Sequence, residues 1–187
     1  MSVDPRIRRQ KLLREAEGYL ELLSACHEKW SAEACVRERL ARRAIAALAQ
    51  LDPGDARGAY VLYLRGHALR DMERYAEAIE PLREAAEIEP ENIATWVALG
   101  WCHKRTGRLD LAIEALEEAL SADAEQAIVH YNLACYWSLA HNADAALAYL
   151  ANAFEIDPSY RRLVATEHDF DPIREHPSFL ELTSVVV

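Results

Sequence analysis

The residue types that carry catalytic chemistry are present in this chain of 187 residues, but their spacing assembles no catalytic or metal site. The seven histidines form no His-x3-His pair, and the adjacent Cys102 and His103 would point in different directions on a helix. Neither a glycine-rich phosphate loop nor a Gly-x-Ser-x-Gly elbow occurs. We therefore expect no enzymatic activity, no bound metal and no cofactor.

A binding chemistry is better supported, because aromatic and cationic residues recur at helical spacing. Residues three and four positions apart share one face of a helix. Three sets with this spacing are Tyr60, Tyr63, His67 and Arg70; Ala94, Val97, Trp101 and Lys104; and Ile128, Tyr131, Cys135 and Ser138. Tyrosine and tryptophan bury a large area at low entropic cost, and arginine pairs with carboxylates. Such faces are typical of grooves that bind a peptide.

We call these three sets the inner stripe. The predicted peptide-binding residues are Tyr60, Tyr63, His67, Arg70, Val97, Trp101, Lys104, Arg105, Tyr131, Asn132 and Cys135. The tyrosines and Trp101 would anchor an apolar or helical segment of a partner, and the cations Arg70, Lys104 and Arg105 would hold an acidic group near it. The alternative is that some of the aromatic side chains pack against a cap or a neighbouring repeat.

The elements that must position this stripe recur every 34 residues. The windows 59–92, 93–126 and 127–160 align without a gap, and three places in each window are always glycine or alanine. These residues are Gly66, Gly100 and Ala134; Ala78, Ala112 and Ala146; and Ala85, Ala119 and Ala153. Antiparallel helices approach to about 8 to 10 Å, and the closest crossings accept only very small side chains. The pattern therefore predicts stacked helix hairpins.

Larger residues add a resemblance to a known family. The second window reads Trp96, Leu99, Gly100, Ala112 and Leu116, and prolines occupy the ends of two windows at Pro90 and Pro158. This pattern resembles the tetratricopeptide repeat, W-x2-L-G-x2-Y, then A-x3-F, then P. Departures from the pattern are Arg65, His103, Ala124 and His130. The resemblance implies an all-α, right-handed α-solenoid of antiparallel helix hairpins whose concave surface is lined by the first helix of each repeat.

The segments on either side of the three repeats are predicted to be caps. Residues 1–58 are interpreted as a degenerate N-terminal hairpin, with helices over 5–29 and 32–51. Residues 161–187 are interpreted as C-terminal capping helices and a tail, with short helices near 160–165 and 177–182. Terminal repeats need such caps because their outer face would otherwise expose core residues.

The charge distribution limits the partners. The net charge is −10, with +2 in residues 1–58 and −12 in residues 59–187, so most of the molecule repels nucleic acid and anionic membrane. Glutamates at four- and three-residue steps predict one solvated convex face. They are Glu73, Glu77, Glu80, Glu84 and Glu87. The basic N-terminal helix is interpreted as a solvated or acid-pairing face, and its pairing with the acidic surface of a second copy is an alternative.

The chain has no long apolar segment, and its four cysteines, Cys26, Cys35, Cys102 and Cys135, lack the spacing of a disulfide framework or a zinc site. We expect them to be buried thiols in a cytoplasmic protein. The function predicted is that of an adaptor or assembly scaffold that binds a partner protein, and the alternative is a homo-oligomeric structural module. The family resemblance also implies a negative: tetratricopeptide co-chaperones that bind a C-terminal carboxylate have lysine at the fifth place of the repeat and asparagine at the ninth. Here those places hold Tyr63 and His67, or Val97 and Trp101, and Asn132 alone resembles a residue of that clamp, so recognition of a chaperone tail is not expected.

Overall fold

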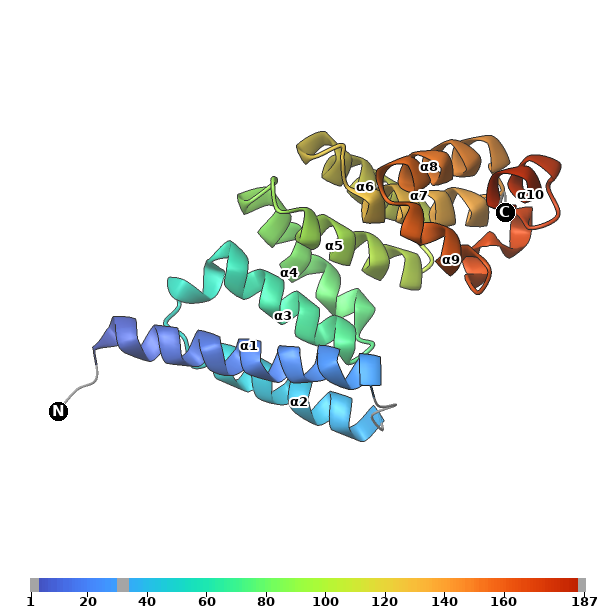
Figure 1. Cartoon of the computed structure of the whole chain (residues 1–187). Coiled ribbons are helices and arrows are strands. Elements are labelled where there is room, and N and C mark those ends of the chain that lie inside the picture. Colours follow the sequence, from blue (N-terminus) through green and yellow to red (C-terminus); the bar gives the residue numbers. More distant parts are fainter. Residues whose placement is uncertain (1–3, 30–33, 185–187) are drawn as a thin grey trace.

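Helices account for the regular structure throughout the part of the chain that the computed structural model describes, which is residues 4–29 and 34–184, with side chains for 4–24 and 35–184 (Figure 1). The helices are α1 (Pro5–Lys29), α2 (Ala34–Leu48), η1 (Asp55–Arg57), α3 (Ala59–Asp71), α4 (Tyr75–Ile88), α5 (Ile93–Arg105), α6 (Leu109–Ala122), α7 (Ala127–Leu139), α8 (Ala143–Ile156), η2 (Pro158–Tyr160), α9 (Arg161–Val164), η3 (His168–Ile173) and α10 (Pro177–Thr183). The elements labelled η are 3₁₀ helices. The predicted all-α solenoid is confirmed.

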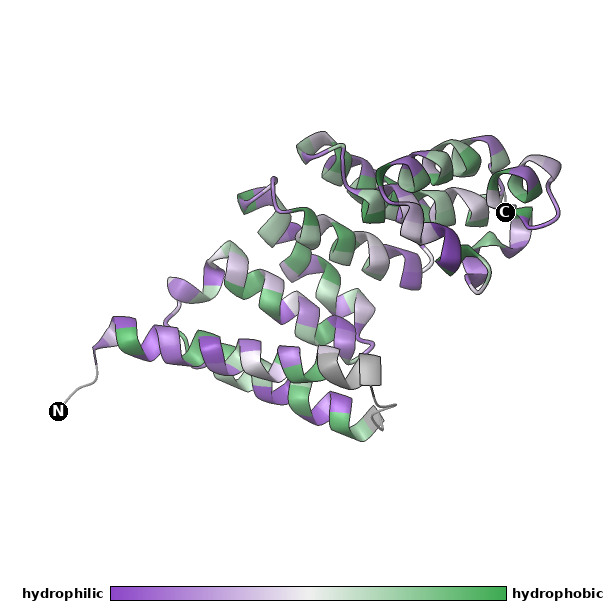
Figure 2. Ribbon diagram, viewed as in Figure 1, coloured by the Kyte–Doolittle hydropathy of each residue, from purple (hydrophilic) through white to green (hydrophobic). Residues whose placement is uncertain are grey.

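The hairpins α1–α2, α3–α4, α5–α6 and α7–α8 stack in sequence order, so that α1 and α10 lie at opposite ends of the stack (Figure 1). The first helices of the three central hairpins begin at Ala59, Ile93 and Ala127, so they start 34 residues apart. Figure 2 shows hydrophobic residues along the packed helices and hydrophilic ones at the loops that join them. The inner stripe thus lies on α3, α5 and α7.

The small residues are buried where helices cross, as the sequence predicts. Gly66 on α3 faces Leu82 of α4 so closely that a Cβ atom on Gly66 would overlap the Leu82 Cγ and lie 2.6 Å from the Leu82 Cδ2. The equivalent contact of Gly100 is less tight, with a Cβ atom 3.3 Å from the Leu116 Cγ. The third hairpin has Ala134 at this place, and its side chain is fully buried. The crossing therefore loosens from the first hairpin to the third, where it admits a methyl group.

The turn inside each central hairpin has the same backbone geometry. Glu73, Gly107 and His141 all have positive φ, at 58°, 77° and 58°. The next residue in each turn donates its N–H to a carbonyl five residues earlier, for example from Arg74 to Leu69 at 2.9 Å. This is the Schellman motif, which satisfies carbonyl groups at a helix end. The turn, like the crossing, therefore recurs every 34 residues.

One departure from the repeat pattern is compensated by a hydrogen bond. The Trp96 Nε1 donates to the carbonyl oxygen of Pro90 at 2.8 Å, which ties α5 to the preceding loop. His130 occupies the equivalent place on α7, and its Nε2 lies 2.8 Å from the carbonyl oxygen of Ala124. Because a carbonyl oxygen only accepts, the His130 Nε2 carries the proton. His130 therefore makes the same hydrogen bond to the preceding loop that Trp96 makes, with a smaller side chain.

The cysteines differ in their burial. Cys102 and Cys135 are buried, as expected, whereas Cys35 is exposed on α2, so the prediction was wrong for that residue. The side chain of Cys26 and the tail residues 185–187 lie outside the described residues. None of the described helices combines the length and the apolar character needed to cross a membrane.

Candidate functional site

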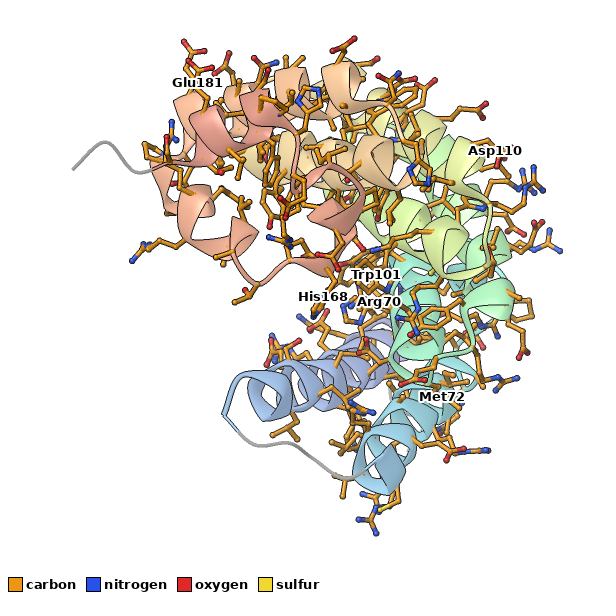
Figure 3. All side chains as sticks on the ribbon, turned by 90° about the vertical axis from the view of Figure 1, so that its right-hand side faces the viewer. Arg70, Met72, Trp101, Asp110, His168 and Glu181 are labelled. Atoms are coloured by element: carbon orange, nitrogen blue, oxygen red, sulfur yellow. The ribbon has the colours of Figure 1, made fainter. Side chains whose placement is uncertain are left out.

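The inner stripe is open to solvent near the N-terminal hairpin, where two adjoining pockets lie between α1, α3 and α5. The first pocket has a volume of about 320 Å³ and is lined by Glu17, Leu20, Glu21, Ser24, Tyr60, Tyr63, Leu64 and His67. The second has a volume of about 410 Å³ and is lined by Ser24, Arg37, Arg70, Asp71, Glu73, Tyr75 and Trp101. Ser24 lines both, so we treat them as one surface, the N-terminal groove. Figure 3 shows Arg70 and Trp101 close together at its centre.

The first pocket has an aromatic wall and an acidic rim. The rings of Tyr60 and Tyr63 stack with centroids 6.5 Å apart and an interplanar angle of 22°. Tyr60 is 43% exposed, and its hydroxyl donates to the Glu17 Oε1 at 2.9 Å. Burial, this hydrogen bond and the charges of Glu17 and Glu21 together raise the pKa of Tyr60 to about 12. The rim of this pocket is acidic because two carboxylates line it and none of its described lining residues is a lysine or an arginine.

The second pocket combines cations with Trp101 and Tyr75. Trp101 is 38% exposed, and the guanidinium of Arg105 lies 4.9 Å from the centroid of the Tyr75 ring. The Arg37 guanidinium lies 3.6 Å from a carboxylate oxygen of Glu73. A guanidinium 4.9 Å from a ring centroid, as Arg105 is from Tyr75, is attracted to the π system of the ring. The two pockets therefore differ in charge, the first acidic and the second mixed.

A half-buried polar cluster on α3, formed by His67, Arg70 and Asp71, joins the two pockets. Arg70 lies 3.2 Å from the Asp71 Oδ1 and 2.7 Å from the His67 Nε2. Since a guanidinium can only donate, the His67 Nε2 accepts and the ring proton lies on Nδ1, which is 3.2 Å from the Asp71 Oδ2. Burial alone would raise the pKa of Asp71, but the hydrogen bonds from His67 and Arg70 and the charge of Arg70 outweigh it and leave the pKa below its usual value. Arg70 is therefore engaged within the chain.

Replacing Asp71 by asparagine should destabilise the protein by about 1 kcal/mol at neutral pH, because the neutral amide keeps one hydrogen bond but loses the charge. A carboxyl group whose folded pKa is depressed contributes stability above its unfolded pKa, and this contribution is lost as the pH falls through the folded pKa. The difference between the Asp71→Asn variant and the parent should therefore shrink below about pH 4. Urea denaturation at neutral and at acidic pH measures it, and a difference that is independent of pH would contradict the assigned ionisation.

At α7 the chain itself covers Tyr131 and Cys135 of the inner stripe, which corrects part of the sequence prediction. Tyr131 is only 5% exposed, with its ring centroid 5.0 Å from that of Tyr160 and 5.7 Å from that of Phe170 in η3. Cys135 is buried in the same core cluster, and Asn132 is half-buried. Tyr131 and Cys135 therefore line no open groove. The alternative raised from the sequence, packing against a cap, describes Tyr131.

Lys104 on α5 marks the boundary between the open and the covered parts of the stripe. Its ammonium group is hydrogen-bonded to the carboxylate of Asp169 in η3. It also lies 5.0 Å from the centroid of the Trp101 ring and 5.6 Å from that of Tyr136. Val97, two turns before Lys104 on α5, is half-buried against the core.

Of the predicted residues, the structure brings together Tyr60, Tyr63, His67, Arg70 and Trp101 in the N-terminal groove. Arg105 lies beside them over Tyr75. Three lining residues of the groove were not predicted, because α1 was interpreted as a cap. They are Glu17, Glu21 and Ser24. A signal was available, since these three residues are four and three positions apart and share one face of α1.

Comparisons with known proteins agree on the type of repeat. The profile of the tetratricopeptide repeat matches residues 69–134. Anaphase-promoting complex subunit 3 of Dictyostelium discoideum is 41% identical over 51 residues, which are 27% of this chain and 5% of that protein. The human cell division cycle protein 16 homolog is 34% identical over 55 residues, 29% of this chain and 9% of that protein. The matched segments thus span less than a tenth of these relatives.

Solved structures of MamA have a similar fold over most of their length. A crystal structure of MamA protein superimposes with a TM-score of 0.62 at 18% identity, covering 90% of this chain and 91% of that one. MamA from Desulfovibrio magneticus RS-1 superimposes with a TM-score of 0.60 at 20% identity, covering 83% and 94%. At this level of identity the likeness concerns the fold alone.

Proposed function

Since the chain is a tetratricopeptide repeat protein, we propose that it acts as an interaction scaffold that captures a peptide or helix of a partner protein in the N-terminal groove. The observation that carries this proposal is the pair of adjoining pockets, whose aromatic side chains Tyr60 and Trp101 stay exposed, whereas Tyr131 on α7 is covered. Large exposed aromatic side chains in a concave surface are typical of the anchors of protein interfaces.

The C-terminal segment supports this proposal, because it already packs against part of the inner stripe within the same molecule. Phe170 of η3 is fully buried against Tyr131, a member of the inner stripe on α7. A segment of this chain with little regular helix is thus held on the concave side by an aromatic side chain and by the pair of Lys104 with Asp169. The N-terminal groove offers the same types of group, on α3 and α5, to a segment from another molecule.

Selection of random peptides of about 12 residues on the immobilised protein, followed by affinity measurements in solution, tests the proposal. We expect the Tyr63→Ala and Trp101→Ala variants each to weaken binding by about 30-fold, because aromatic anchors at the centre of an interface are worth about 2 kcal/mol. The helical circular dichroism should be unchanged. The matched control is Ile88→Ala, which removes an exposed apolar side chain outside the groove and should leave affinity within twofold.

Selected peptides that bind the double variant Tyr63→Ala/Trp101→Ala as tightly as the parent would reject the groove as the binding site. Light scattering at tens of micromolar separates the homo-oligomeric alternative. If the parent forms dimers or larger species and the double variant is monomeric, the occupant of the groove is a second copy of this chain.

A further inference from the structure

The first pocket of the N-terminal groove is acidic on one side and aromatic on the other. Glu17 and Glu21 come from one face of α1, and Tyr60 and Tyr63 come from α3. Among the described residues that line this pocket, none is a lysine or an arginine. The Arg70 guanidinium on the next turn of α3 is held by Asp71 and His67, so it does not neutralise the two carboxylates.

Elsewhere in the same molecule, an aromatic ring and a carboxylate together bind the ammonium group of a lysine. The Lys104 ammonium lies over the ring of Trp101 and pairs with the carboxylate of Asp169. One aromatic face and one carboxylate thus hold a cation at the centre of the inner stripe. The first pocket presents two stacked aromatic rings, with centroids 6.5 Å apart, and two carboxylates. Its binding groups are therefore complementary to a cation with an apolar stem.

We infer that the pocket formed by Glu17, Glu21, Tyr60 and Tyr63 binds an arginine or lysine side chain of the captured peptide, an inference that rests on the proposed function. The aliphatic stem packs along the stacked rings above the buried Leu20 and Leu64, and the charged head reaches the carboxylates. A cation over an aromatic face is attracted to it, and charge-assisted hydrogen bonds to a carboxylate are stronger than neutral ones. A volume of about 320 Å³ suits one long side chain.

The electrostatics of Tyr60 agree with this assignment. The Tyr60 hydroxyl donates to Glu17, so one carboxylate oxygen is fixed at the rim of the pocket. No hydrogen bond or ion pair within the described part of the chain engages Glu21. Its carboxylate is therefore open to a cationic group from outside, and the field of the two acids also acts on the phenol.

The test uses peptides selected for binding to the groove. Each arginine of such a peptide is replaced in turn by citrulline, which has the same shape without the charge, and each lysine by norleucine. We expect one position at which the replacement weakens binding to the parent protein at least tenfold. In the Glu17→Gln/Glu21→Gln variant, the same replacement should change affinity by less than twofold, because the partner charges are gone.

The matched control is Glu80→Gln/Glu84→Gln, which removes two carboxylates from α4 outside the groove and should retain the full tenfold penalty. Peptides that depend on Tyr63 but contain no charge-sensitive position would overturn this inference and leave the proposed function standing. A tenfold penalty that persists in the Glu17→Gln/Glu21→Gln variant would also overturn it. If no selected peptide depends on Tyr63, the proposed function fails, and the inference fails with it.

Discussion

Replacing Phe170 by alanine should lower the free energy of unfolding by about 3 to 5 kcal/mol, the range measured when a buried phenylalanine is truncated. The Phe170 side chain is fully buried, and its ring lies against those of Tyr131 and Phe179, with centroids 5.7 Å and 5.5 Å away. The truncation removes this apolar area and leaves a cavity between η3 and α7. Urea denaturation followed by circular dichroism measures the loss.

A matched control lies in the same terminal segment. Leu180 on α10 is about half exposed, so Leu180→Ala should cost less than about 0.5 kcal/mol. The Phe170→Ala variant should also expose the thiol of Cys135, whose burial holds its pKa well above the usual value. Faster modification of Cys135 by a thiol-reactive dye would follow. A loss below about 1 kcal/mol with Cys135 still protected would show that the cap does not depend on this ring.

Replacing Gly66 by alanine should lower the free energy of unfolding by about 2 kcal/mol, the balance of two opposing effects. Alanine has a better helix propensity than glycine by about 1 kcal/mol, but overpacking a core typically costs about 1 to 3 kcal/mol and occasionally more. Here the steric effect dominates, because the new Cβ atom would overlap the Leu82 Cγ. Leu82 is fully buried, so moving its side chain would disturb the packing around it. Thermal and urea denaturation both measure this loss.

Two other glycines provide the comparison. Gly100→Ala should be better tolerated, since the nearest atom to its Cβ would be the Ala112 carbonyl oxygen at 3.1 Å. A Cβ atom on Gly18 in α1 would meet no other atom within 4 Å, so Gly18→Ala should stabilise the protein by up to about 1 kcal/mol. The expected order of stability is therefore Gly18→Ala, then Gly100→Ala, then Gly66→Ala. A Gly66→Ala variant as stable as the parent would contradict the tight crossing of α3 and α4.

The hairpins were predictable because close helix crossings restrict side-chain size, and that restriction is visible in Gly66, Gly100 and Ala134. The turns were less visible. Gly107 suits a positive φ, but Glu73 and His141 adopt the same conformation although their side chains disfavour it. There the repeated packing of the two helices fixes the backbone, so residue type alone could not reveal the turn.

The candidate site was predicted only in part, for a similar reason. Tyr60, Tyr63 and Trp101 follow from helical spacing, which is a local property. The burial of Tyr131 depends on Phe170, a residue far along the chain that returns to α7 only in the folded protein. The acidic rim depends on how α1 lies against α3. Contacts between distant segments of the chain leave no periodic pattern, so Tyr131 was assigned to the groove. Glu17 was left out because α1 was interpreted as a cap, although its spacing from Glu21 and Ser24 places all three on one face.

The contact of η3 with α5 has a consequence for any molecule that lies along the inner face. Asp169 of η3 pairs with Lys104, whose ammonium group also lies over the Trp101 ring, so η3 is tied to α5 beside the second pocket. The N-terminal groove is thus bounded at its α5 end by the pair of Lys104 with Asp169. A segment that runs from α3 toward α7 must terminate or turn outward at this point, so the position of its end, as well as its side chains, determines how it fits.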